Sequence, residues 1–186
     1  MDTRTYNLRE TLKNGLSVTV RAIRADDKEG ILESFKELDD DTLYRRFFAP
    51  KKELSHAELR QLTEVDFDRT VALVVTLASG AREQIIGGGR YIAFKDAEGI
   101  DSAEFAMIVE EDYQGLGLGK LIFGHLMSIA RAQGITRFEA EVLPANDRML
   151  SLLRKAGLPV RMVTRDESVY VSMDLNPSPD NEKKKK

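Results

Sequence analysis

Three glycines lie within five residues of this chain, at Gly115, Gly117 and Gly119. They follow an apolar run that ends at Val109 and precede a segment whose apolar residues recur at helical spacing. Glycine lets a backbone approach a ligand closely, and the free N–H groups and dipole at a helix N-terminus attract anions. A tight connection between a strand and a helix would need fewer glycines. The spacing therefore predicts a binding site for a phosphate-bearing ligand.

The two most familiar phosphate-binding signatures do not match this segment. A dinucleotide-binding turn has the spacing G-x-G-x-x-G, whereas the third glycine here is Gly119 and not residue 120. A P-loop has the form G-x-x-x-x-G-K-[ST], but Leu121 follows Gly119-Lys120, and Gln114 stands where the first glycine belongs. The ligand is therefore expected to belong to another class.

A strand over residues 101–109 and a helix from Leu118 to about Gly134 would hold this turn in place. A second helix is expected to begin at Asn146 and to end at Gly157. The remaining β-branched or alternating runs predict strands at residues 71–77, 84–94, 137–143, 160–164 and 169–175. Within one of these strands, Gly87-Gly88-Gly89 indicates a bulge or a close approach to the backbone, for example by a substrate chain.

The N-terminus predicts a β-hairpin. Apolar and polar residues alternate over residues 6–12 and again over residues 16–20, with Asn14-Gly15 between them. Asn-Gly suits a type I′ turn, in which both central residues need a positive φ. We therefore expect a two-residue turn at Asn14 and Gly15.

Three helices are expected after the hairpin. Asp26 and Asp27 are candidate caps for the first, and the second covers residues 41–48 and ends before a proline. Ser55 and Glu58 are spaced as a capping box, which predicts a third helix that runs through residue 62. With the later elements, the order indicates an α+β (mixed α/β) domain around a mostly antiparallel sheet.

Composition narrows the possible chemistry. The chain has 186 residues, a net charge of −3, no cysteine, and two histidines, His56 and His125. These numbers exclude thiolate chemistry, disfavour a metal site and give no reason to expect a nucleic-acid partner. No apolar run suits a signal peptide or a membrane span, so we expect a cytoplasmic protein without a membrane partner. We expect one domain over residues 1–175 and a disordered, lysine-rich polar tail over residues 176–186.

The pattern Gln114-x-x-Gly117-x-Gly119 resembles [QR]-x-x-G-x-[GA], the acyl-CoA signature of the GNAT superfamily of N-acetyltransferases. The order of elements up to residue 158 also matches the motifs of that family. Segments in both halves are similar to the acetyltransferase domain of Pat-type protein lysine acetyltransferases, namely residues 21–27, 43–48, 54–56, 66–69 and 149–157. The resemblance covers roughly residues 5–175, so we expect a catalytic module that stands without the further domains of some Pat proteins.

This resemblance implies a GNAT-like fold, with a mostly antiparallel twisted sheet flanked by helices, and acetyl-CoA as co-substrate without a metal. Backbone groups of Met107, Ile108 and Val109 should bind the pantetheine arm and the acetyl carbonyl, and Asn146 should contact the same arm. The pyrophosphate should be held by the turn formed by Gln114, Gly115, Leu116, Gly117, Leu118, Gly119 and Lys120.

Glu104 is the candidate general base. It interrupts an apolar run over residues 103–108, where a carboxylate is costly to bury. Burial raises the pKa of a carboxyl group toward neutrality, which suits a group that takes a proton from a lysine amine. Pat-type enzymes carry a catalytic glutamate in a strand that resembles this one. Two other interpretations stay open, a glutamate on the solvent face and one paired with an arginine.

The acceptor is expected to be a protein lysine, which attacks acetyl-CoA directly; in Pat-type relatives it often belongs to an acyl-CoA synthetase. A small amine, such as a polyamine or an amino acid, is the alternative acceptor. A further alternative is a catalytically weak acyl-CoA-binding regulatory module. Leu153 favours this alternative, because many GNAT enzymes have a tyrosine at that position as the general acid.

Overall fold

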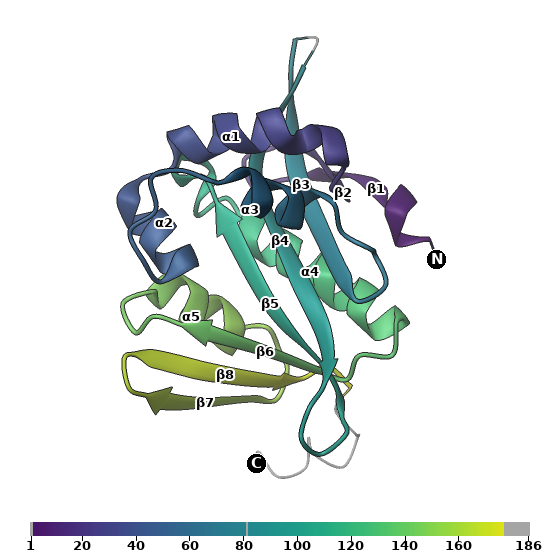
Figure 1. Ribbon diagram of the computed structural model, residues 1–186, viewed down its shortest axis with the longest axis vertical. Helices are drawn as coiled ribbons and strands as arrows, with labels where there is room; N and C mark the ends of the chain where they lie inside the picture. The colour runs from purple at the N-terminus through teal and green to yellow at the C-terminus, as the bar shows by residue number, and fades with distance from the viewer. Residues whose placement is uncertain (1, 81, 177–186) are drawn as a thin grey trace.

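The structure, a computed structural model, describes residues 2–80 and 82–176, so all but the first residue of the expected C-terminal tail lies outside the described residues. Within these ranges, eight strands form one sheet in the order β1-β2-β3-β4-β5-β6-β8-β7 (Figure 1). The strands are β1 (Asn7–Thr11), β2 (Ser17–Ala22), β3 (Thr70–Ser79), β4 (Arg82–Lys95), β5 (Asp101–Val109), β6 (Arg137–Val142), β7 (Val160–Arg165) and β8 (Ser168–Asp174). The α-helices are α1 (Lys28–Glu37), α2 (Asp40–Phe47), α3 (His56–Thr63), α4 (Leu118–Ala132) and α5 (Asp147–Arg154). Three short 3₁₀ turns are η1 (Thr3–Thr5), η2 (Ala25–Asp27) and η3 (Glu111–Tyr113).

Every neighbouring pair of strands is antiparallel except β5 and β6, which are parallel. Helix α4 packs on one face of the sheet against β3, β4 and β5, and α5 adds Leu150 and Leu153 to the same core. Helices α1, α2 and α3 lie over the opposite face (Figure 1). The predicted fold class, a mostly antiparallel sheet flanked by helices, is confirmed.

The apolar stripe of α4 is the largest helical contribution to the core. Leu118, Ile122, Leu126 and Ile129 are each no more than 3 % exposed. Residues three or four apart lie on one face of a helix, so this stripe meets the sheet as a continuous surface. The helix therefore begins where the glycine turn ends, and Leu118 at its first position packs over Gly87 of β4.

The glycine run of β4 lies beside a β-bulge and leaves room for α4 to pack on the sheet. The β3–β4 register shifts between Val75 and Thr76, opposite this run. A Cβ on Gly89 would lie 2.7 Å from Cγ2 of Ile122 and 2.9 Å from Cδ1 of Leu126. The element that approaches this backbone is therefore a helix of the same chain, and only glycine leaves room for it.

The predicted hairpin exists, but its turn is not of type I′. Gly15 has a positive φ of 84°, while Asn14 is not among the residues with positive φ. Leu12 and Leu16 are paired by a hydrogen bond of 2.9 Å, which makes a three-residue loop with glycine last. The Oδ1 of Asn14 accepts the N–H of Leu16 at 3.1 Å, and this local bond favours the longer loop.

Ser55 and Glu58 form the predicted capping box of α3. By contrast, the side chain of Asp27, the N-cap of α1, makes no capping hydrogen bond to that helix, so this expectation is wrong. The carboxylate of Asp27 instead accepts two hydrogen bonds from Arg21, at 2.7 and 2.8 Å, and one from the N–H of Arg24 at 2.7 Å. Arg21 is buried and needs an anionic partner. Burial alone would raise the pKa of Asp27, but these bonds and charges outweigh it and lower the pKa.

Substitution of Gly89 by alanine should destabilise the fold by about 1–3 kcal/mol, because the new methyl group overpacks the interface with α4. The control is Gly124→Ala within α4, where a Cβ would meet nothing within 4 Å. This change should stabilise the helix by about 0.5–1 kcal/mol. Urea unfolding of both variants measures the difference, and equal free energies of unfolding would contradict the packing argument.

Candidate functional site

The parallel strands β5 and β6 separate soon after they pair. Their register includes only Ser102 with Arg137, Ala103 with Phe138, and Glu104 with Glu139. On its other side, β5 stays paired with β4 as far as Val109. Figure 1 shows β5 and β6 diverging from this short junction. The second half of β5 therefore has one edge without a strand partner, and its backbone groups on that edge are free to bind a ligand.

A cleft of about 960 Å³ occupies the space where the strands diverge. It extends from the free edge of β5 to the N-terminus of α4 and to α5. Of the predicted site residues, Leu116 alone does not line it, because its side chain packs on the main core. The structure brings the others together, namely Glu104, Met107, Ile108, Val109, Gln114, Gly115, Gly117, Leu118, Gly119, Lys120 and Asn146.

The N-terminus of α4 is open to the cleft. Gly117 is the N-cap with a φ of 95°, and no side chain caps the helix. Gly115 also has a positive φ, of 80°. The N–H groups of the first turn have no partner within the helix, so they can donate to an anion. The side chain of Gln114 donates to the carbonyl of Val109 at 3.0 Å, which ties the turn to the end of β5.

Basic side chains surround this end of the cleft, and most of them were not singled out from the sequence. Lys13 and Lys120 line it at this end, and Arg148 and Lys155 line it from the two ends of α5. Lys13 comes from the β1–β2 hairpin, where its N–H donates to the carbonyl of Leu116 at 3.2 Å. No local pattern predicts that contact. Arg148 and Lys155 are seven residues apart across α5, and this spacing could have placed them on one face of the helix.

Asn146 has the predicted cap role and also lines the cleft. Its Oδ1 accepts the N–H of Met149 at 3.2 Å, which begins α5. Leu153 of the same helix is fully buried in the main core. Among the described residues that line the cleft, none is a tyrosine, a histidine or a cysteine.

Glu104 is exposed, and the predicted burial of its side chain is wrong. Successive side chains of a strand point to opposite faces, so Phe105 and Met107 fill the core while Glu104 faces the cleft. The negative charge of Glu104 acts on Arg46 and Arg90, but no ion pair forms within 4.0 Å between described residues here. A second carboxylate that the sequence did not single out, Glu141 of β6, also lines the cleft.

The histidine on the apolar stripe of α4 has structural partners. Nδ1 of His125 lies 2.5 Å from the hydroxyl of Tyr6, and its Nε2 lies 3.3 Å from a carboxylate oxygen of Glu10. Neither His56 nor His125 lines the cleft. Within residues 2–80 and 82–176, no group of three or more histidine, aspartate or glutamate side chains is arranged to hold a metal ion. Over the same ranges, no helix has the length and hydrophobicity needed to cross a membrane.

Comparison with known proteins agrees with this geometry. A family model described as the acetyltransferase (GNAT) family matches residues 32–158. Acetyltransferase PA5475 of Pseudomonas aeruginosa is 32 % identical over 148 residues, which cover 80 % of this chain and 78 % of the relative. Acetyltransferase Pat of Mycolicibacterium smegmatis is 33 % identical over 138 residues, or 74 % of this chain, which spans only 40 % of that relative. The crystal structure of the GNAT domain of S. lividans PAT has a TM-score of 0.81 and 32 % identity, covering 90 % of this chain and 96 % of that domain.

One buried carboxylate at the end of β5 is unfavourable to the fold. Glu110 is 7 % exposed, and its Oε2 has no hydrogen-bond partner among the described residues. Burial raises its pKa, and the charges of Asp112, Glu37 and Glu111 raise it further. Because the folded state holds this proton more tightly than the unfolded chain, the side chain lowers stability as the pH rises above its unfolded pKa.

The substitution Glu110→Gln should therefore raise the melting temperature at pH 7 by roughly 2–4 °C, since this corresponds to on the order of 1 kcal/mol in a domain of this size. At pH 4 the gain should be smaller, because the carboxyl group is then mostly protonated in both states. Thermal unfolding at the two pH values, with the same substitution at the exposed Glu98, Glu98→Gln, as control, measures the effect. A gain that does not depend on pH would contradict the role assigned to charge.

Proposed function

The chain belongs to the acetyltransferase (GNAT) family, and on this premise we propose that it transfers the acetyl group of acetyl-CoA to the ε-amine of a protein lysine. Enzymes of this family use acetyl-CoA as the acyl donor. The similarity to Pat acetyltransferases supports a lysine acceptor. The observation that carries the proposal is the cleft between β5 and β6, which joins a free strand edge to the uncapped N-terminus of α4.

The residues of the cleft fit the chemical groups of acetyl-CoA. N–H groups from Gly115 to Lys120 suit the pyrophosphate, and the cationic side chains of Lys13, Arg148 and Lys155 suit the total phosphate charge. The free edge of β5 from Met107 to Val109 suits the amide groups of the pantetheine arm. Asn146, the N-cap of α5, lines the same cleft and suits a contact with that arm.

The reaction is proposed as one direct step. Glu104 takes a proton from the acceptor ammonium, alone or through a water, and the neutral amine attacks the thioester carbon. Strand N–H groups of β5 polarise the carbonyl, the C–N bond forms and the C–S bond breaks. The second proton, which the nitrogen loses as the amide forms, passes to the leaving thiolate or to water. The coenzyme supplies an activated acyl group whose thiolate is a tolerable leaving group, so the buried Leu153 is compatible with turnover without a side-chain acid. The cleft's main contribution is to hold both reactants in position.

The identity of the acceptor is tested by thiol release from acetyl-CoA with two pools, proteins of a cell extract and a panel of small amines. Acetylation of a few specific protein lysines, read by mass spectrometry, is the result expected. Release with small amines alone would move the assignment to a metabolite acetyltransferase. Binding of acetyl-CoA without release in either pool would favour a regulatory acyl-CoA-binding module.

Replacement of Gly117 by alanine should raise the Kd of acetyl-CoA at least tenfold, because an alanine strains the backbone at its φ of 95° and moves the N–H groups of the turn. The matched control is Gly134→Ala, which has a similar φ of 83° and lies beyond the other end of α4. Both variants should lose about 1–2 kcal/mol of stability. Titration calorimetry with acetyl-CoA separates them, and equal affinities would refute the anion site.

The change Glu104→Gln should lower kcat about a hundredfold or more, while the Kd of acetyl-CoA changes little, because only proton transfer is removed. Glu141→Gln is the matched control, since Glu141 also lines the cleft but lies on β6. Steady-state kinetics with the acceptor from the preceding assay measures both variants. A loss of turnover in Glu141→Gln but not in Glu104→Gln would show that Glu104 is not the base.

A further inference from the structure

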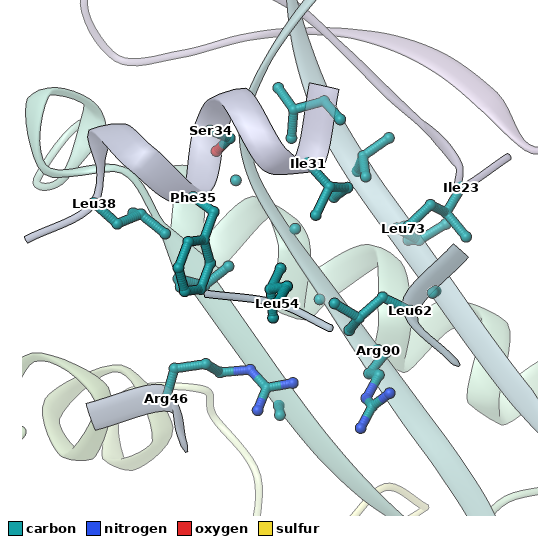
Figure 2. Close-up of a pocket in the computed structure, with 18 of the residues that line it drawn as sticks. Ile23, Ile31, Ser34, Phe35, Leu38, Arg46, Leu54, Leu62, Leu73 and Arg90 are labelled. Atoms are coloured by element: carbon teal, nitrogen blue, oxygen red, sulfur yellow. The ribbon is translucent and has the colours of Figure 1, made fainter. Parts of the chain in front are cut away.

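A second, smaller cavity lies on the face of the sheet that α1, α2 and α3 cover. Its volume is about 100 Å³, several times the roughly 10–15 Å³ that one water molecule needs. Figure 2 shows its wall of apolar side chains, which includes Ile31, Phe35, Leu54 and Leu62. Two arginines, Arg46 of α2 and Arg90 of β4, lie together at one end of it (Figure 2).

The cavity exists because the sheet carries small residues beneath these helices. Arg90 is paired in register with Ala72 on β3 and with Ala106 on β5, so the three side chains share one face. In the next row, Gly88 has no side chain, and a Cβ there would lie 2.8 Å from the carbonyl oxygen of Leu73. The sheet residues next to Arg90 therefore fill little of the space beneath the helices.

The cavity adjoins the larger cleft. Arg46, Ala106 and Ile108 line both of them. Ile108 is one of the residues whose backbone is proposed to lie at the acetyl group, and Glu104 lies on the same face of β5 as Ala106. A chemical group that extends from either reactant at the reaction centre could therefore reach the arginines.

The two guanidinium groups lack an anionic partner. Among the described residues, neither Arg46 nor Arg90 donates a side-chain hydrogen bond or lies within 4.0 Å of a carboxylate. Glu104 is the acidic residue whose charge acts on both, and its single charge does not balance two.

The surroundings make these charges costly. Burial, together with the positive charge of Arg90, lowers the pKa of Arg46 to about 10, although Glu104 acts in the opposite direction. Burial also lowers the pKa of Arg90, again against the charge of Glu104. Both side chains are only partly buried, and the guanidinium carbon of Arg46 lies 5.1 Å from the centre of the Phe47 ring. A carboxylate ligand would supply the anionic partner that both charges lack.

We infer that Arg46 and Arg90 form a binding site for a carboxylate carried by one of the two substrates. Guanidinium groups match a carboxylate through paired N–H donors, and the apolar walls beside them suit the short carbon chain that carries it. The carboxylate belongs either to the far end of the acyl group, as in succinyl-CoA, or to a position beside the acceptor amine. This inference rests on the proposed function, because the cavity is reached through the proposed reaction centre.

The test compares pairs of substrates of similar size, in which one member carries the carboxylate and the other lacks it. In the first arm, titration calorimetry gives the Kd of succinyl-CoA and of butyryl-CoA, which has the same chain length without the charge. In the second arm, the rate of thiol release from acetyl-CoA is measured with single-lysine peptides that carry either glutamate or glutamine beside the lysine. For the wild-type chain, the carboxylate-bearing substrate of one arm should have a Kd about tenfold lower, or a rate about tenfold higher, than its uncharged counterpart.

The variants Arg46→Met and Arg90→Met should each reduce that preference toward one, and Arg46→Lys and Arg90→Lys should restore part of it. The Met variants should melt no lower than the wild type, because a costly charge is removed. If a Met variant fails to fold, the corresponding Lys variant provides the measurement, with a smaller preference than the wild type. A wild type without preference in both arms, or a preference that survives both Met substitutions, would overturn the inference. Failure of the proposed function is read separately, as a wild type that does not bind acetyl-CoA.

Discussion

The short parallel contact between β5 and β6 is the constraint on which the rest of the site depends. Three residue pairs hold the strands together, and beyond Glu104 and Glu139 they diverge. An unpaired strand edge in the interior of a sheet would normally be unfavourable, because backbone N–H and C=O groups need partners. Here the edge faces a cleft of about 960 Å³, where a ligand with amide groups could supply those partners.

Each layer of helices gives this opening a different property. Helix α4 approaches the sheet closely because Gly89 lacks a side chain, and its uncapped N-terminus then faces the cleft. On the other face, α1, α2 and α3 cover a floor of small residues less completely and leave a cavity beside the same strand. One layer thus provides the helix N-terminus of the proposed anion site, and the other leaves space and two arginines near the proposed reaction centre.

Charge is distributed along the cleft in a consistent order. Lys13 and Lys120 lie at the start of α4, where the proposed phosphates would carry the most negative charge, and Arg148 and Lys155 line the same cleft from the two ends of α5. Glu104 lines the same cleft from β5, where it is exposed and its charge acts on Arg46 and Arg90. The exposed position of Glu104 means that its proposed role as base depends on where it lies and on neighbouring charges, rather than on burial.

Much of the fold could be predicted because its signals are local. Helical periodicity predicted α4, the box of Ser55 and Glu58 predicted the start of α3, and Asn146 predicted the start of α5. The strand at residues 101–109 was predicted with the bounds that β5 has. The glycine turn could be recognised because positive φ and free helix N–H groups depend on residues that are adjacent in sequence.

The tertiary structure decided the features that depend on distant contacts. Whether Glu104 is buried depends on which face of β5 the helices cover, and alternation along the strand does not specify that. The contact of Lys13 with Leu116 joins residues about one hundred positions apart, and Arg46 of a helix and Arg90 of a strand line one cavity. The sequence by itself therefore determined most of the elements and the glycine turn for which anion binding is proposed. Packing decided which charged side chains surround it, because only the folded chain brings them to the same cleft.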